Sequence, residues 1–361
     1  MSSFWNNRIS ISIFGEADAP AIGVTIDNLP AGEPIDTDAI ARFMSRRSIT
    51  GPQASRSRNG LPRIMSGISR NRTSGAPLCA FLNNPAIKSV RHDASENLVR
   101  PGHADYTGAV RYRGYADVRS SSIFADKMTA PLCFAGAVCA QILERRGIYT
   151  GAHILSIHNI KDNPFDPVNI TRDGIISIRE KEFPVINDSR GWKMLQDIRM
   201  AAVGGETLGG VIECASVNVP AGIGSPIFNG LENSIAQLVF GIPGIRGLEF
   251  GSGFRSAGMV GSQNNDDFYV NGHGHVVTRT NNHGGILGGI SSGMPVTLKA
   301  AVMPPAVTGK DMRTLNEYEQ SDVDSSEGAE TVCTVAGTVP CIEAAVNIAL
   351  LSHMLDYPNF C

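Results

Sequence analysis

Cysteine is sparse and unpaired in this sequence, and several other features are scarce. The seven cysteines are scattered and never spaced as CxxC, which argues against a structural zinc site and a disulfide framework. Aromatic residues make up only 6% of the chain, which is low for proteins that stack on nucleic-acid bases. The net charge of −3 creates no field that would attract nucleic acid or an anionic membrane. We therefore expect no nucleic-acid partner and no membrane partner.

A metal motif and a targeting segment are also missing. His273, His275 and His283 cluster in sequence, but no nearby carboxylate or cysteine completes a ligand set, so we expect no metal. The first ten residues are polar, and no run approaches the roughly 18 apolar residues of a membrane span. With 42% hydrophobic and 18% charged residues over 361 positions, we expect a cytoplasmic globular protein with an ample core.

Hydrophobic spacing predicts strand pairs that alternate with long helices. Residues 8–27 predict two strands around a turn, and Asp36 or Thr37 is expected to cap the helix that follows. Further helices are expected near 129–147, 194–202, 231–239 and 342–353, and further strands at 152–160, 174–186 and 211–219. No glycine fingerprint opens a βαβ unit, so the α+β class is favoured. We expect one domain over residues 1–361, with a mobile loop at 314–331.

The stretch RPGHADY at residues 100–106 concentrates groups that could do chemistry. Arg100 offers a forked donor suited to phosphate or carboxylate, and His103 can transfer a proton near neutral pH. The alternative is a turn with an ordinary surface histidine. Residues 42–72 are rich in arginine and indicate either a solvated basic loop or the rim of an anion site. The glycine-rich residues 281–293 indicate either a backbone nest for an anion or flavin edge, or a structural turn.

Further sequence motifs occur along the chain in addition to RPGHADY and the glycine-rich stretch. RPGHADY is accompanied by Gly15-Glu16, AIGVTID at 21–27, GGVIE at 209–213, GLEFGSGF at 247–254 and GGILGGISSG at 284–293. From about Phe14 to about Leu351 the sequence resembles chorismate synthase. The resemblance implies helices sandwiched between antiparallel β layers, a homotetramer and a small shikimate-type substrate. It also implies a step of aromatic amino acid synthesis, the 1,4-elimination of phosphate from 5-enolpyruvylshikimate 3-phosphate with reduced FMN.

The resemblance also assigns residues to roles. His103 and Asp18 occupy the catalytic positions. Arg47, Arg100 and Arg56 are expected to bind substrate. The flavin site is expected to be lined by Gly288, Gly289, Pro243 and Gly244.

Several of these positions depart from the family pattern. Asp18 stands where the family has its first catalytic histidine, and an ionised aspartate repels a phosphate. Met303 replaces a lysine, and residues 328–333 lack the family's arginine and carboxylate. One hypothesis is an enzyme of this family with altered activity or substrate, and it predicts a flavin-sized space beside Gly288. The other is a non-catalytic paralogue, in which Phe124, Met128 and Met303 fill the pocket.

Overall fold

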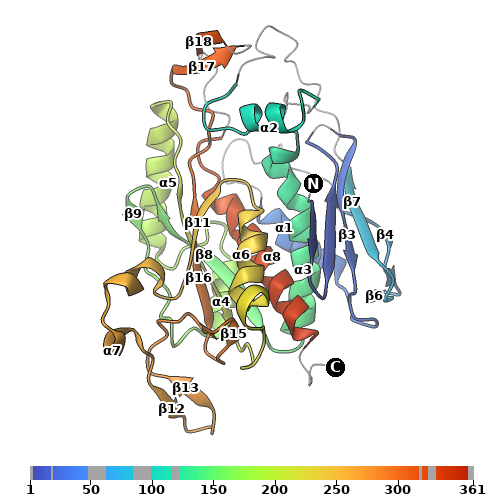
Figure 1. Cartoon of the computed structure of the whole chain (residues 1–361), viewed down its shortest axis with the longest axis vertical. Coiled ribbons are helices and arrows are strands. Elements are labelled where there is room, and N and C mark those ends of the chain that lie inside the picture. The colour runs from blue at the N-terminus through green and yellow to red at the C-terminus, as the bar shows by residue number, and fades with distance from the viewer. Residues whose placement is uncertain are drawn as a thin grey trace.

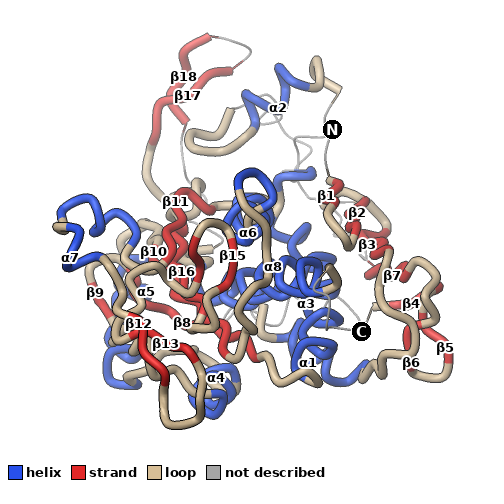
Figure 2. Tube along the Cα trace, turned by 60° about the horizontal axis from the view of Figure 1, so that its bottom comes forward, coloured by secondary structure: helices blue, strands red, loops and turns tan. Residues whose placement is uncertain are grey.

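The structure is a computed structural model, and it describes residues 3–17, 19–47, 62–83, 99–115, 122–316, 319–323 and 331–356. Within these residues, two five-stranded antiparallel sheets enclose a layer of helices (Figure 1). The view in Figure 2 separates the two sheets again, with α3, α6 and α8 between them. The predicted α+β class, with helices between antiparallel layers, is confirmed.

The first sheet contains the strand pair predicted from residues 8–27. Its order is β1 (Phe4–Asn6), β2 (Ser10–Phe14), β3 (Ala21–Asp27), β7 (Leu78–Asn83) and β4 (Arg63–Ser66). Alternate side chains of β3, from Ile22, Val24 and Ile26, are fully buried. Because side chains alternate along a strand, this pattern gives the sheet one face packed toward the interior.

The second sheet lies on the other side of the helices. Its order is β11 (Ile245–Phe250), β16 (Val296–Val302), β10 (Gly210–Val217), β8 (Tyr149–Ile157) and β9 (Ile160–Lys161). The strands predicted at 152–160 and 211–219 correspond to β8 and β10, although β8 ends at Ile157. Central strand β10 pairs with both β8 and β16, so residues far apart in sequence share one sheet face.

Helices α3 (Thr129–Glu144) and α8 (Val335–Met354) form the centre of the helical layer. They cross so closely at Gly136 that a Cβ there would lie 2.2 Å from the Cβ of Ala344. Helix α8 is long and apolar enough to cross a membrane, and 89% of its most apolar window is buried inside the protein. Such burial is typical of a core helix in a globular protein.

Six further α-helices lie in the described part of the chain. They are α1 (Thr37–Ser45), α2 (Asp105–Arg111), α4 (Arg172–Arg179), α5 (Asp188–Val203), α6 (Leu231–Phe240) and α7 (Gly261–Asn264). As predicted, Asp36 caps α1 through its side chain, which accepts hydrogen bonds from the amides of Asp38 and Ala39. The strand predicted at 174–186 is wrong. Thr171 accepts a hydrogen bond from the amide of Gly174 at 3.1 Å and starts α4 instead.

Four small two-stranded sheets lie outside the two main sheets in the described part of the chain. They are β5 (Ile68–Ser69) with β6 (Arg72–Thr73), β12 (Phe268–Val270) with β13 (Val276–Thr278), β14 (Ile286–Leu287) with β15 (Ile290–Ser291), and β17 (Met312–Asn316) with β18 (Glu319–Val323). The loop expected at 314–331 is therefore wrong for residues 314–316 and 319–323, which form a hairpin. Residues 317–318 and 324–330 of that prediction lie outside the described residues.

Candidate active site

The RPGHADY motif forms a turn that runs into α2, and its three charged groups meet there. Asp105 accepts two hydrogen bonds from the Arg100 side chain, each at 2.7 Å, and one from the Arg100 amide at 3.0 Å. The Nδ1 atom of His103 lies 2.5 Å from Oδ1 of Asp105. Gly102 has a φ of 75°, a left-handed conformation that glycine adopts without strain, and this lets the chain fold back on itself.

These contacts decide the charge state of the carboxyl and the orientation of the imidazole. Burial alone would raise the pKa of Asp105, but the bonds from Arg100 and His103 outweigh burial and hold this pKa well below its usual range. An ionised Asp105 can only accept, so the proton of His103 sits on Nδ1. The other ring nitrogen, Nε2, is then the atom through which His103 can exchange a proton with a ligand.

Arg47 lies just beyond α1 and is held by the start of α3. Its Nε and Nη2 donate to Oγ1 of Thr129 at 3.1 and 2.7 Å, and Nη2 also donates to the carbonyl of Asp126 at 3.0 Å. Although Asp126 is exposed, protein surrounds much of its carboxyl and raises its pKa, while the positive charges of Arg47 and His103 oppose this shift. Arg47 and His103 therefore act on a common carboxyl.

The short helical turn Asp126–Met128 also contacts the segment that follows the Gly15-Glu16 motif. The Nζ atom of Lys127 donates to the carbonyl of Ala17 at 3.3 Å, which brings the segment after Gly15-Glu16 to the same place. Asp18, the residue expected at a catalytic position, lies outside the described residues, as does Arg56. Segments that lie far apart in the sequence thus converge on one turn.

Thr129 and Asp126 were missed as site residues by sequence reasoning. Thr129 is the first residue of α3, at the start of the helix expected near 129–147, and its hydroxyl accepts from Arg47. The one usable signal was the position of Thr129 at the start of a long apolar helix. Two of the side chains expected to fill the pocket of a non-catalytic paralogue pack beside elements that form the site. Phe124 lies against Gly108 of α2, and Met128 packs on a small cluster with Ile22 and Leu82.

Residues 303–306 link two of the expected site segments. The amide of Met303 donates to the carbonyl of Gly244 at 2.8 Å, next to Pro243. A Cβ on Gly102 would lie 3.5 Å from the Cβ of Ala306, in contact with the RPGHADY turn. The turn at Pro243 and Gly244 and the turn at Gly102 therefore lie at the two ends of one short segment.

This segment does not fit the phosphate of a flavin. A phosphate site needs cations or free backbone N–H groups. Met303 offers a thioether, which accepts from Nε of Arg246 at 3.2 Å, and its own N–H is engaged with Gly244. Pro304 and Pro305 have no N–H at all. Residues 303–305 thus present neither a charge nor a free donor to an anion.

The expected flavin glycines lie away from His103 in this chain. Gly288 and Gly289 form the turn of the β14–β15 hairpin, which lies near the bottom of Figure 1, whereas α2 lies at the top. Both glycines have positive φ, and the carbonyl of Gly289 accepts from the amide of Leu231 at 2.9 Å. The structure thus brings Arg47, Arg100 and His103 to one region and leaves Gly288 and Gly289 outside it.

The histidines at 273, 275 and 283 spread over the β12–β13 hairpin and the turn that follows it. Among the described residues, no group of three or more histidine, cysteine, aspartate or glutamate side chains is placed to hold an ion. His283 does have a nearby carboxylate: its Nε2 lies 3.3 Å from Oδ2 of Asp266. The Asp266 side chain is buried and accepts from Thr280 and from two backbone amides, so its role is to hold this turn together.

Comparison with known proteins places this arrangement in a family. The family model for chorismate synthase matches residues 9–355. A chorismate synthase of Lancefieldella parvula is 36% identical over 99% of this chain and 98% of its own length, and one of Thermococcus kodakarensis is 33% identical over 96% of each. A crystal structure of chorismate synthase superposes with a TM-score of 0.77 at 24% identity, over 97% of this chain and 92% of that one, and it confirms the fold. The chain belongs to the chorismate synthase family.

Proposed function

We propose that this chain keeps the substrate-binding part of a chorismate synthase site and lacks the part that holds flavin. Its ligand would be a shikimate-type ring that carries carboxylate and phosphate groups, as 5-enolpyruvylshikimate 3-phosphate does. The observation that supports this proposal is the Arg100–Asp105–His103 cluster, which orients an imidazole that acts, like Arg47, on the carboxyl of Asp126. Arginine suits both anionic groups because its forked donors match carboxylate and phosphate.

The chain's own residues would bind the ring and exchange a proton with it. Arg47 contributes positive charge, Asp105 fixes His103 with its proton on Nδ1, and Nε2 of His103 faces the ligand. Reduced FMN, when bound to a family member, supports the elimination of phosphate. The segment 303–305 gives no reason to route a step through flavin here. Each missing cationic contact lowers anion binding by roughly 1.5–3 kcal/mol, so we expect weak FMN binding.

Ordinary chorismate synthase activity is the second candidate. It is favoured by the identity to a protein named chorismate synthase over 99% of the chain. Under this candidate Arg56, which lies outside the described residues, would supply a cationic contact that residues 303–305 lack. Under this candidate the protein is a phosphate-eliminating lyase of the shikimate pathway.

Two binding titrations and one genetic test separate the candidates. Calorimetry with 5-enolpyruvylshikimate 3-phosphate should show binding that Arg47→Ala weakens roughly tenfold or more and that the exposed-site control Arg8→Ala leaves unchanged. FMN fluorescence should be quenched little at micromolar protein. Failure to bind the phosphorylated ring would overturn the proposal. Growth of a chorismate synthase deletion strain carrying this chain, together with tight FMN binding, would establish the second candidate.

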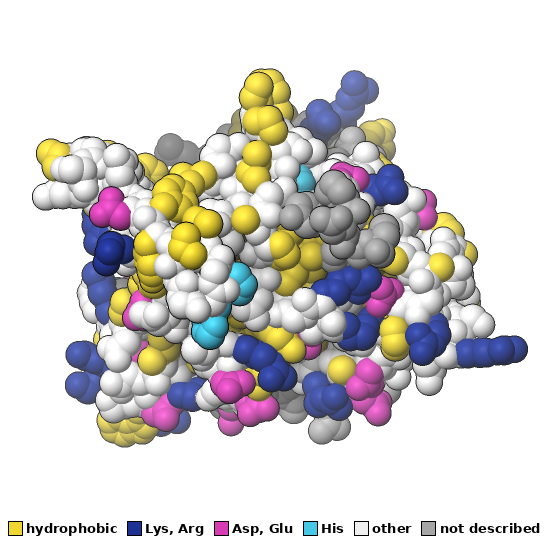
Figure 3. Space-filling model, turned by 90° about the horizontal axis from the view of Figure 1, so that it is seen from below, with side chains coloured by type: hydrophobic (Ala, Val, Ile, Leu, Met, Phe, Trp, Pro, Cys, Tyr) yellow, Lys and Arg dark blue, Asp and Glu magenta, His cyan; other side chains and the backbone are white. Residues whose placement is uncertain are grey.

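The resemblance to the family also suggests an oligomeric state and a cellular location for this protein. We propose a cytoplasmic homotetramer, supported by the apolar side chains that reach the surface. Phe228 and Ile227 are 92% and 74% exposed, and the strands β12 and β13 expose further apolar residues. Figure 3 shows several apolar groups on the lower face of the molecule, between polar areas. Sedimentation velocity tests the assembly: a monomer at micromolar concentration would contradict it, and Phe228→Ser should shift a tetramer toward smaller species.

A further inference from the structure

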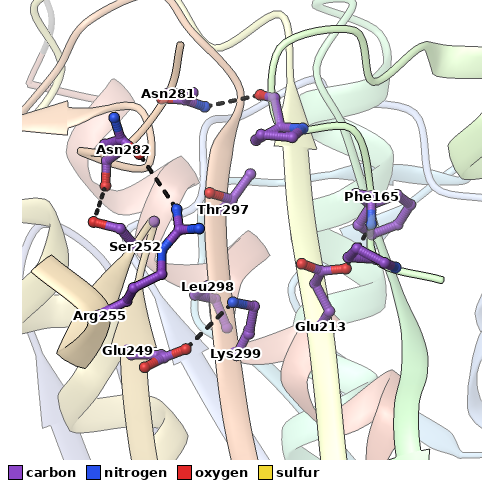
Figure 4. A pocket seen from close by; sticks show the side chains of 13 residues that line it. Phe165, Glu213, Glu249, Ser252, Arg255, Asn281, Asn282, Thr297, Leu298 and Lys299 are labelled. Atoms are coloured by element: carbon purple, nitrogen blue, oxygen red, sulfur yellow. Dashed lines mark hydrogen bonds and ion pairs between the residues drawn. The ribbon is translucent and has the colours of Figure 1, made fainter. Parts of the chain in front are cut away.

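A row of charged side chains crosses four strands of the second sheet. Cα pairing places Glu249 of β11 opposite Lys299 of β16, Lys299 opposite Glu213 of β10, and Glu213 opposite His153 of β8. Directly opposed residues on neighbouring antiparallel strands have side chains on the same face. These four side chains therefore lie in one line across the sheet, and Figure 4 shows three of them, Glu249, Lys299 and Glu213, side by side.

This row lies on the face of the sheet that points away from the central helices. The neighbours of Glu213 on β10, Ile212 and Cys214, belong to the main core, together with α3 and α8 residues. Because side chains alternate along a strand, Glu213 points to the opposite face. The row is therefore separated by the sheet from the Arg47 and His103 region, which lies on the side of the helical layer.

Glu213 is buried, and only one of its two carboxylate oxygens accepts hydrogen bonds from residues that the structure describes. The residue is 6% exposed, and its Oε2 accepts from Nε2 of His153 at 2.9 Å and from the amide of Phe165 at 2.7 Å. Among the described residues, its Oε1 receives no hydrogen bond. Glu213 lines a cavity of about 320 Å³, and Figure 4 shows one carboxylate oxygen directed toward that space. A carboxylate oxygen that faces a cavity and has no protein donor is available to a ligand that supplies one.

The same side of the sheet also carries positive charge. The guanidinium of Arg255 enters from the neighbouring wall, and its hydrogen bond to Oδ1 of Asn282 is long, at 3.5 Å. Within the described part of the chain Arg255 forms no ion pair. Lys299 reaches Glu249 at 3.3 Å, so these two charges offset each other. Glu213 shares the His153 imidazole with Asp162, whose Oδ2 lies 3.5 Å from Nδ1 of that ring, so these two carboxylates carry more charge than one imidazolium offsets. The guanidinium of Arg255 faces Glu213 across the cavity.

The remaining lining is apolar on the side of residues 164–167. Pro164, Phe165 and Pro167 form that wall, and the volume is within the range of small-molecule sites. A ligand that matches this lining needs a positive group, a negative group and an apolar body. We propose that the cavity binds a small zwitterion, an amino acid with an apolar side chain. Its ammonium group donates to Glu213, its carboxylate accepts from Arg255, and its side chain packs on Phe165.

Calorimetry on the full chain with L-phenylalanine as the probe tests this site. Wild-type protein should bind the amino acid more tightly than 2-phenylethylamine, which lacks the carboxylate, and 3-phenylpropionate, which lacks the ammonium group. Arg255→Gln and Glu213→Gln should each weaken binding about tenfold or more, since each removes one charged partner. The control Arg279→Gln changes an exposed arginine that stacks on Tyr269 and should leave binding unchanged.

Three outcomes would overturn the proposal. They are no heat of binding at millimolar L-phenylalanine, equal affinity for either half-molecule and the whole, and an Arg255→Gln protein that binds as tightly as wild type. Glu213 also holds Phe165 and His153, so the Glu213→Gln protein is compared with wild type only if its melting temperature stays close to that of wild type. Arg255 is exposed, so its substitution removes the charge without disturbing the core.

Discussion

Arg46 and Glu343 form a forked ion pair inside the protein, with Nη1 2.5 Å from Oε2 and Nη2 2.7 Å from Oε1. Glu343 is fully buried on α8, and it also accepts from the amide of Ala152 on β8 at 2.9 Å. The pair ties the end of α1 and the second sheet to the central helix. It also fixes the backbone directly before Arg47.

Removal of one partner of this buried ion pair should strongly lower the free energy of unfolding. Glu343→Ala leaves the Arg46 guanidinium buried without a counter-charge, and we expect a loss of about 3–5 kcal/mol in the free energy of unfolding, measured by urea denaturation. Asp356→Ala, which breaks the exposed pair with Arg8, should cost less than about 1 kcal/mol. Equal losses in the two variants would contradict the stabilising role given to the buried pair.

Asp105 should stabilise the protein only while it is ionised. Its pKa is depressed in the folded state, so its contribution is present above the unfolded value of about 3.9 and is lost as the pH falls through the folded value. We expect Asp105→Asn to be about 1–3 kcal/mol less stable than wild type near pH 7, with the gap closing in acid. The exposed Asp267→Asn serves as the control. A gap that stays constant into strong acid would refute this linkage.

His153 should show the opposite pH dependence. Burial alone would lower its pKa, but the neighbouring carboxylates of Asp162 and Glu213 outweigh burial and raise it. The stabilisation by protonated His153 is therefore complete below about 6.5, the unfolded value, and fades as the pH rises through the folded value. Unfolding of His153→Gln should differ most from wild type below this unfolded value and least in alkaline solution. His275→Gln, an exposed change, should show no such trend.

Gly136 should tolerate no side chain. Alanine is the better helix former, so Gly136→Ala would stabilise an isolated helix by about 1 kcal/mol. Here its Cβ would meet Ala344 at 2.2 Å, and we expect a net loss of about 1–3 kcal/mol in thermal or urea unfolding. Gly261→Ala, where a Cβ has no neighbour within 4 Å, is the matched control. A Gly136→Ala protein as stable as wild type would show that α3 and α8 can separate without cost.

Hydrophobic spacing predicted most of the helices and strands, although the central helices α3 and α8 are buried on almost every face. It failed at residues 174–186, where Ile175, Ile176 and Ile178 suggested a strand. Ile175 and Ile178 are buried at a spacing of three residues, which suits a helix as well, and the cap at Thr171 decides the outcome. The β-branched run alone could not distinguish the two.

The site was predictable only as far as its motifs are continuous in sequence. The RPGHADY motif predicted the cluster of Arg100, His103 and Asp105, because all three residues lie within a single short stretch. The anchoring of Arg47 by Thr129 depends on how α1 meets α3, and the row from His153 to Glu249 depends on strand register. Both are set by packing between segments that no local pattern connects, so the sequence carried no signal for them.

Under the proposal that this chain holds no flavin, the prolines after Met303 have a consequence for any attempt to build a flavin site here. A lysine placed at 303 would return one charge, but the main chain at Pro304 and Pro305 would still offer no amide hydrogens and would keep its φ angles fixed. Under this proposal, a flavin phosphate site at this segment would require a main-chain amide hydrogen at position 305 as well as a charge at position 303.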